Sequence, residues 1–509
     1  MHFCALPDDA ILAVVKCVMD ATRRSSTTVS KLEHVFFPEF SSRDPEHPLE
    51  SLSMTCRRLR AVCVPILFQC MSLTDERDLD DIPSVLSHAR IFSLRHISTP
   101  RGVEALFKAA PRVCEAYCDR GVQEGVLPVI LSCPTLEILT FKNVSIAGHF
   151  PSLRVAAPLR SLRCIFSSLR SPGDINSKYT PRSHCFLQER ELLESVIAQC
   201  RATLEVLVLP GESTRLSALA PAAWPRLREL SICGIGPELD ASFSQLFAAM
   251  PNLEVLTLLL SQRHHGPPLT ILPADPKDAF VDLARLVRVT LSYPNPVDGV
   301  FRGLTPALRE LSIRDSPRFY WITEHSNSFY RTPILCCRDA LHIFRQLSDG
   351  ADAASNLERL ELVVRATETE IEDEMELYAF VAAACPRLRV LELHRYRNVL
   401  DPRDVRVAIP LDAIADALQG FRSLSHLRLN VDLPLQWHTP DSYPRFVDEL
   451  DELAARVARA LPWLDTFELF HMNFADRYTW QPWRVQPGGG GVLRVLKPHY
   501  IESYDMAWL

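Results

Sequence analysis

The sequence has no long hydrophobic run. Its longest stretch without Asp, Glu, Lys or Arg, from Ala61 to Thr74, is 14 residues long and contains Pro65. A membrane-spanning helix needs about 20 consecutive apolar residues, so none is expected. The N-terminal residues also lack a basic segment and turn acidic at Asp8, which argues against a secretory signal. We therefore expect an intracellular protein, cytoplasmic or nuclear, with no membrane partner.

An excess of positive charge is missing as well. The 509 residues include 55 Lys and Arg against 62 Asp and Glu, a formal net charge of −7. A chain of this charge is not expected to bind nucleic acid through a generally basic surface. Its 15 cysteines are an odd number, and neither Cys114 with Cys118 nor Cys336 with Cys337 has a second pair at zinc-binding spacing. The cysteines are thus interpreted as reduced packing residues.

Catalytic signatures are absent too. The sequence contains no His-Glu-x-x-His, Gly-x-Ser-x-Gly or Gly-x-x-x-x-Gly-Lys-Ser/Thr motif. The pair His264-His265 lacks a ligand partner at metal-binding spacing, Gly488–Gly491 suits a flexible hinge, and the acidic run Glu368–Glu376 suits a solvated helix start. We predict no catalytic residue, no cofactor and no metal. An enzyme whose site is assembled from distant residues is the least favoured alternative.

Leucine and proline are the residues in excess. There are 71 leucines, and the 38 prolines outnumber the 17 glycines, although average usage favours glycine. Such a chain is searched first for internal repeats. The pattern Leu-x-x-apolar-x-apolar, often led by proline, occurs twelve times. Its first leucines are Leu136, Leu159, Leu204, Leu227, Leu253, Leu286, Leu308, Leu357, Leu388, Leu424, Leu464 and a frayed Leu493.

Each occurrence combines a short strand with a preceding helix. The last two apolar positions are two residues apart, so both point to the same side of an extended strand. Upstream, apolar residues recur every three or four positions, as in Arg445–Leu461, and proline then ends the helix. The other helices expected are Gln188–Cys200, Ser242–Met250, Ala279–Leu286, Asp339–Leu347, Glu374–Cys385 and Leu411–Leu418. One unit alone cannot bury the apolar sides of its strand and its helix, so the units are expected to stack on one another.

The pattern resembles the irregular, fungal-type leucine-rich repeat. That resemblance implies an α/β leucine-rich-repeat solenoid, with a curved parallel sheet and helices on its convex side, over residues 131–509. Residues 76–130 would be a linker and the first degenerate repeats. The asparagine position of regular repeats is mostly absent, since Ile232 is followed by Cys233-Gly234, for example. A conventional α/β sheet domain is the alternative fold.

Residues 1–75 do not fit the repeat and resemble an F-box. The matching parts are Leu6-Pro7-Asp8-Asp9-x-Ile11-Leu12, Leu52-Ser53-x-x-Cys56-Arg57-x-Leu59-Arg60 and Pro65-x-Leu67-Phe68, with an insertion at about 20–48. The resemblance implies a small helical module that docks on the Skp-type adaptor of a cullin-RING ubiquitin ligase. The adaptor contacts it implies are Leu6, Pro7, Ile11, Leu12, Leu52, Ser53, Cys56 and Leu59. The alternative is a hydrophobic cap for the solenoid.

The strand residues between the core positions are expected on the concave face. They are Glu229, Ser231, Thr257, Glu310, Ser312, Arg314, Arg359, Glu361, Glu392, His394, His426, Arg428, Asn430 and Glu468. Their mixed charge suits a protein partner better than a phosphate backbone. Aromatic and arginine residues are frequent interface anchors, so we predict partner contacts at Arg314, Tyr320, Trp321, Arg359, His394, His426, Arg428, Trp437, Trp480 and Trp483. The loop aromatic rings could instead pack back onto the solenoid edge.

Taken together, these resemblances imply a non-catalytic substrate-recognition subunit of an SCF-type ubiquitin ligase. The F-box would bind the Skp-type adaptor and, through it, the cullin scaffold, while the solenoid would bind a target protein whose identity the sequence does not give. The alternative is a leucine-rich-repeat scaffold or interaction protein without a ubiquitin-ligase partner.

Overall fold

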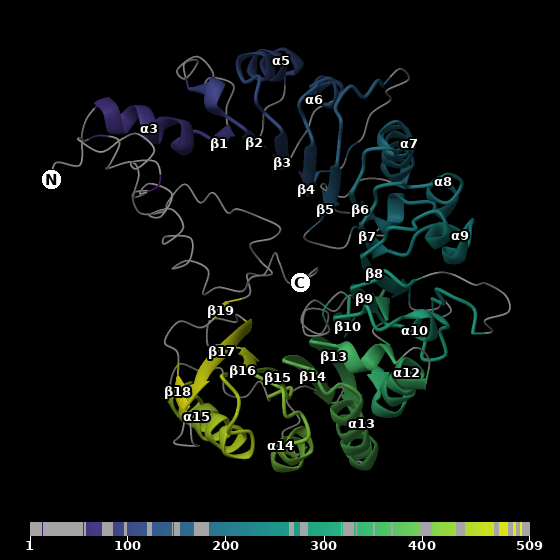
Figure 1. Ribbon diagram of the computed structural model, residues 1–509, viewed down its shortest axis with the longest axis vertical. Coiled ribbons are helices and arrows are strands. Elements are labelled where there is room, and N and C mark those ends of the chain that lie inside the picture. Colours follow the sequence, from purple (N-terminus) through teal and green to yellow (C-terminus); the bar gives the residue numbers. More distant parts are fainter. Residues whose placement is uncertain are drawn as a thin grey trace. The chain divides into compact units, whose positions relative to one another are not determined.

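The computed structural model describes most of the repeat region and little of the N-terminal segment (Figure 1). None of the helices it describes is both long and apolar enough to cross a bilayer. The described residues are 13, 54, 57–73, 85–95, 99–119, 125–144, 146, 153–166, 170, 183–263, 269–274, 283–316, 318, 330–331, 333–349, 352–367, 370–397, 410–433, 443–472, 478–486, 492–494 and 499–500.

The chain divides into two compact units, which are described separately. The first comprises Met1–Ile165 and Pro181–Leu204, and the second comprises Phe166–Thr180 and Glu205–Leu509. Strands β1 to β5 of the first unit lie side by side in sequence order, and all are parallel. Its elements are α3 (Arg57–Leu67), β1 (Cys70–Leu73), η2 (Leu86–His88), β2 (Ile91–Arg95), α5 (Pro100–Ala109), β3 (Glu115–Asp119), α6 (Val126–Leu131), β4 (Ile138–Lys142), β5 (Ser161–Ile165) and α7 (Ser183–Cys200).

The parallel array begins well before residue 131. Strands β2 and β3 lie in the stretch where the sequence indicated a linker and degenerate repeats. In β3 the core positions hold Ala116 and Cys118, and Val113 occupies the place of the first leucine; all three are buried. These small or branched residues fill the same inward positions as the leucines of later strands, which is why a leucine search does not detect the strand.

The second unit continues the same construction over more strands. Strands β6, β7, β8, β9, β10, β13, β14, β15 and β16 pair in this order and are all parallel. Their bounds are Val206–Pro210, Glu229–Ile235, Val255–Arg263, Arg288–Ser292, Glu310–Arg314, Arg359–Ala366, Val390–Arg397, His426–Asn430 and Thr466–Met472. Two short strands, β11 (Tyr330–Arg331) and β12 (Leu335–Cys336), pair with β8 and β13.

The C-terminal end of the second unit is antiparallel. Strand β17 (Tyr478–Val485) runs against β16, and β18 (Val492–Arg494) and β19 (His499–Tyr500) run against β17. The twelfth leucine pattern, at Leu493, therefore belongs to an antiparallel end strand and is not a repeat of the parallel array. This corrects the sequence-based interpretation of that segment.

Helices of the second unit cover one face of its sheet. Figure 1 shows α12, α13, α14 and α15 on one side of β13 to β16, and we call the opposite face of the sheet the open face. The helical elements are η3 (Gly211–Ser213), α8 (Leu216–Leu219), α9 (Phe243–Ala248), α10 (Val300–Gly303), α12 (Cys337–Asp349), η4 (Ala353–Asn356), α13 (Ile371–Ala384), α14 (Leu411–Leu418) and α15 (Tyr443–Ala460). Of the helices expected from sequence, Ala279–Leu286 differs, because its described end at 283–286 is a turn.

The core lies between the sheet and these helices. Leu311 and Ile313 of β10 stand in register with Leu360 and Leu362 of β13, and all four are buried. Because side chains alternate along a strand, the residues between them lie on the open face. A parallel sheet whose strands are each reached through a buried leucine turn and, in many repeats, a covering helix is a leucine-rich-repeat solenoid.

A polar ladder replaces the missing asparagine position. At several repeats the residue before the first leucine donates a side-chain hydrogen bond to a backbone carbonyl of an earlier repeat, as Asn252 does to Pro225 at 2.8 Å. The same position is used by Thr135, Thr203, Asn356, Ser423 and Trp463, whose acceptors are the carbonyls of Val113, Leu159, Pro306, Pro386 and Phe421. These bonds satisfy turn carbonyls that the strand ladder leaves unpaired. The solenoid therefore keeps a ladder, but at a different position and with varied residue types.

Candidate functional site

The parallel register gathers polar side chains from distant repeats into rows on the open face. One row holds Ser312, Glu361, Glu392, Arg428 and Glu468, which are direct partners on successive strands β10, β13, β14, β15 and β16. The next row, two residues further along each strand, holds Ser292, Arg314, His394 and Asn430. Residues up to 176 positions apart in sequence thereby line one face of the sheet, although the second row is interrupted on β13 by the buried Val363, the direct partner of His394.

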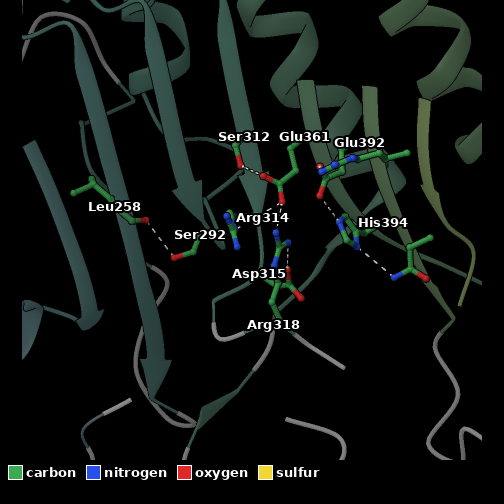
Figure 2. A network of polar contacts seen from close by, with 11 residues as sticks. Leu258, Ser292, Ser312, Arg314, Asp315, Arg318, Glu361, Glu392 and His394 are labelled. Atoms are coloured by element: carbon green, nitrogen blue, oxygen red, sulfur yellow. Dashed lines mark hydrogen bonds and ion pairs between the residues drawn. The ribbon is translucent and has the colours of Figure 1, made fainter. Parts of the chain in front are cut away.

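Glu361 is held by donors from two directions (Figure 2). Its Oε2 accepts a hydrogen bond from Ser312 Oγ at 2.6 Å, and its Oε1 accepts one from Arg318 Nη2 at 2.7 Å. Arg318 Nη1 donates in turn to Asp315 Oδ1 at 3.0 Å. Burial favours the protonated form of Glu361, but the charges of Arg314 and Arg318 outweigh burial and lower its pKa. Glu361 is therefore an anion whose two oxygens both carry hydrogen bonds.

Glu392, the direct neighbour of Glu361 on strand β14, has hydrogen-bond partners of its own. His394 Nε2 lies 3.0 Å from its Oε1, and Arg428 Nη1 donates to its Oε2 at 3.3 Å. Burial raises the pKa of Glu392, but the His394 hydrogen bond and the charge of Arg428 outweigh it and hold the pKa well below its usual range. Arg428 Nε also lies 3.4 Å from Glu468 Oε2. The open face thus carries acidic and basic side chains that partly neutralise one another.

Aromatic rings border this charged surface. His394 lies between Tyr396 and Trp480, with ring centroids 6.2 and 5.5 Å away, and Phe470 is 5.0 Å from Trp480. The Arg428 guanidinium carbon stands 5.5 Å from the Trp480 ring centroid, within cation–π range. Tyr396, Phe470 and Trp480 are themselves buried, and such a low-dielectric neighbourhood strengthens ion pairs.

Arg314 differs from the other arginines of this surface. Its side chain is 9% exposed, and it lies 3.7 Å from Glu361 Oε1 without forming a hydrogen bond to any part of the chain that the structure describes. Burial, together with the nearby charge of Arg318, lowers the pKa of the Arg314 guanidinium. This arginine is therefore a largely buried cation whose Nε donor is unused within the part of the chain that the structure describes.

The same surface contains three groups with metal-ligand chemistry. Ligand atoms of Glu361, Glu392 and His394 all lie within 4.8 Å of one another. However, the carboxylate oxygens already accept hydrogen bonds from Arg318 and Arg428. A divalent cation would have to displace these guanidinium groups and stand beside their positive charges. The arrangement is better suited to a ligand that brings negative or hydrogen-bond-accepting groups.

The open face contains most of the partner contacts predicted from sequence that the structure describes. Arg359 and Arg428 are half-buried, His426 is exposed, and Arg314, His394 and Trp480 are buried. Residues Tyr320, Trp321 and Trp437 lie outside the described residues.

Trp483 requires a correction. The sequence placed Trp480 and Trp483 in an aromatic loop, whereas both belong to strand β17. They point to opposite sides of it, because Trp480 pairs with Phe470 and Trp483 pairs with Phe467 of the core. Trp483 is fully buried, and its Nε1 donates to Asp451 Oδ1 of α15 at 2.7 Å. It is a packing residue that cannot touch a partner.

The predicted adaptor contacts are described only at Leu59. This leucine is buried in α3 together with Cys63, so it supports the helix and offers no surface. The remaining predicted contacts, Leu6, Pro7, Ile11, Leu12, Leu52, Ser53 and Cys56, lie outside the described residues.

Sequence reasoning missed two members of the network, Asp315 and Arg318. They follow strand β10, so no strand periodicity marks them, and Arg318 reaches Glu361 of β13. It also missed Glu374, read as part of a solvated acidic run. Glu374 is fully buried, and Arg395 Nε donates to its Oε1 at 2.7 Å. The one available signal was the helical spacing that places Glu374, Leu377, Tyr378 and Val381 on one buried face.

No protein-family profile and no curated protein sequence matches this chain. The solved structures that are similar to it include three at 12% identity. They are the leucine-rich-repeat protein LegL7 from Legionella pneumophila (TM-score 0.29, covering 80% of this chain and 92% of that one), the complex of Rad7 and Elc1 in yeast (0.35; 82% and 92%), and a Bacteroides fragilis protein (0.18; 52% and 61%). The register of the parallel strands, and not likeness at these TM-scores, defines the fold.

Proposed function

We propose that this protein is a substrate-recognition subunit of an SCF-type cullin-RING ubiquitin ligase. The observation that carries the target-binding part of the proposal is the open face of the second unit, where rows of charged and aromatic side chains from β10, β13, β14, β15 and β16 form one polar surface on a leucine-rich-repeat solenoid, a protein-interaction fold. The resemblance of residues 1–75 to an F-box supports the adaptor-binding part.

Such a subunit acts by proximity. The N-terminal segment would bind the Skp-type adaptor, and through it the cullin scaffold, while the solenoid would hold a target protein. Holding two reactants together converts a bimolecular transfer into an effectively unimolecular one, so the subunit needs no catalytic group. The pairing of Glu361 with Arg318 and of Glu392 with Arg428 holds these side chains in place before a target arrives.

Replacing both Leu6 and Leu52 by aspartate is expected to abolish capture of the Skp-type adaptor. The two leucines belong to the matching parts of the F-box motif, and a carboxylate in an apolar contact carries a large desolvation cost. Capture is measured by incubating the purified full-length protein with purified adaptor and quantifying the bound fraction. We expect a loss of at least tenfold, about 1.4 kcal/mol or more of binding free energy.

Met54→Asp is the matched control, because Met54 lies in the same segment, is 69% exposed and is not among the predicted contacts. It is expected to leave capture unchanged. If the wild-type protein captures no adaptor, or if the double variant captures it as well as wild type, the ligase proposal fails. The solenoid would then stand as an interaction scaffold without a ubiquitin-ligase partner.

A further inference from the structure

Arg314 is the least satisfied charged group of the network in Figure 2. A buried guanidinium that makes no hydrogen bond is costly, because burial removes its water without replacing the hydrogen bonds. Within the described residues, its Nε has no hydrogen-bond partner, and its sole ion pair is the 3.7 Å approach to Glu361. The hydroxyl of Ser316, two residues further along the chain, is also buried without a hydrogen-bond partner in that part of the structure.

The acidic groups near Arg314 already accept hydrogen bonds from other side chains. Both oxygens of Glu361 accept hydrogen bonds, one from Ser312 and one from Arg318. Asp315 is bound to Arg318, and Glu392 is bound to His394 and Arg428. Arg318 therefore takes the hydrogen bonds that would otherwise satisfy Arg314. Arg314 is left with a positive charge and a planar set of N–H donors that no described acceptor uses.

We propose that Arg314 anchors a carboxylate of the target protein, an aspartate or glutamate side chain of a segment lying along the open face. A carboxylate presents two oxygens in the spacing of the guanidinium fork and neutralises one unpaired positive charge. A peptide along this face would also pass the half-buried Arg359 and the exposed His426, which begin the neighbouring strands β13 and β15. This inference rests on the proposed function only in naming the target as the source of the carboxylate.

Acetate serves as the probe of this site. The thermal unfolding midpoint of the full chain is measured at pH 7 in sodium acetate and in sodium chloride of equal ionic strength. Acetate that binds the native protein in the tens-of-millimolar range is expected to raise the midpoint by about 2 °C at a few hundred millimolar. In Arg314→Gln the difference between the two salts is expected to vanish. Since no adaptor is involved, this result does not depend on ligase association.

Arg288→Gln is the matched control. Arg288 also lies on the open face, but both its Nε and its Nη2 donate to Glu310, at 2.7 and 3.1 Å. This variant is expected to keep the acetate effect. Equal midpoints in acetate and chloride for the wild type, or an acetate effect that survives in Arg314→Gln, would overturn the proposal. So would sodium phosphate at the same ionic strength stabilising the protein where acetate does not, since the site would then select phosphate.

A second measurement separates an anchor from a structural ion pair. In chloride, Arg314→Gln is expected to unfold at the same temperature as wild type or higher, because the variant removes a buried and poorly compensated cation. A marked drop in its midpoint, or a failure to fold, would show that Arg314 stabilises the native chain through Glu361 and contradict the proposal.

Discussion

Replacing Glu374 by alanine is expected to lower the free energy of unfolding by about 3–5 kcal/mol. Glu374 lies on α13 with no exposed side-chain surface, and it accepts hydrogen bonds from Arg395 Nε at 2.7 Å and from the Tyr378 hydroxyl at 2.9 Å. Arg395 is itself 2% exposed on strand β14. Removing the carboxylate leaves a buried guanidinium without its counter-charge, a much larger cost than the loss of one surface ion pair. Urea unfolding of the purified chain measures the change.

Glu376→Ala is the control on the same helix. Glu376 pairs with Arg345 at 2.6 Å, but both side chains are about half exposed, so water screens the pair. This variant is expected to change the free energy of unfolding by less than about 1 kcal/mol. Similar losses in the two variants would show that α13 is not held by the buried pair.

Glu392→Gln is expected to destabilise the protein by about 3 kcal/mol at neutral pH, because the change leaves Arg428 with one fewer counter-charge in a nearly buried site. The pKa of Glu392 is held well below its usual range, although burial alone would raise it. Its charge therefore contributes stability above the pKa of about 4.3 that the unfolded chain has, and that contribution is lost as the pH falls below it. The difference in the free energy of unfolding between wild type and Glu392→Gln should therefore decrease steadily below about pH 4.

Glu358→Gln provides the comparison for this titration. Glu358 immediately precedes strand β13 and lies 3.7 Å from Arg309, with half of its side chain exposed. Glu358→Gln is expected to leave the free energy of unfolding nearly unchanged at every pH. A wild-type to Glu392→Gln difference that stays constant from pH 7 to pH 3 would mean that the ionised form of Glu392 does not stabilise the fold.

Much of the second unit could be predicted because the spacing of its leucines reflects which side chains of each strand and helix are buried. Two inward residues per strand and a proline-terminated helix specify both the element type and the buried face, as α13 (Ile371–Ala384), which Pro386 follows, shows for the helix expected at Glu374–Cys385. The first unit was harder to predict because Val113, Ala116 and Cys118 occupy the buried positions that leucines hold in later repeats. The strand β17 was missed because its aromatic residues and Pro482 do not follow the repeat.

The open-face rows could be predicted from the same register, since parallel strands place equivalent residues side by side. That reasoning placed Arg314, Glu361, Glu392 and Arg428 on one face before any contact was known. It could not show that Arg318, rather than Arg314, donates to Glu361 and Asp315, because residues after a strand have no periodic signal. The feature that gives Arg314 its free donors is therefore visible in the structure alone.

The neutralised network also bears on specificity. Because Glu361 and Glu392 are already paired, an approaching basic segment finds few free acceptors, whereas an acidic side chain finds the unused donors of Arg314. Such discrimination has two sources: a basic segment is left without hydrogen-bond acceptors, and an acidic segment gains hydrogen bonds. The open face is thus suited to select by charge within a surface that is nearly neutral.

The central claim, that the open face receives a target protein, is tested most directly by site-specific crosslinking. A photo-reactive amino acid replaces the exposed His426 of β15, or, as a control, the exposed Leu187 of α7 in the first unit. We expect position 426 to crosslink a protein other than the adaptor in native extract, the same species to persist in the Leu6 and Leu52 double variant, and the yield to fall when Arg314→Gln is added. Crosslinks at position 426 that contain the adaptor alone, or that form equally at position 187, would contradict the account.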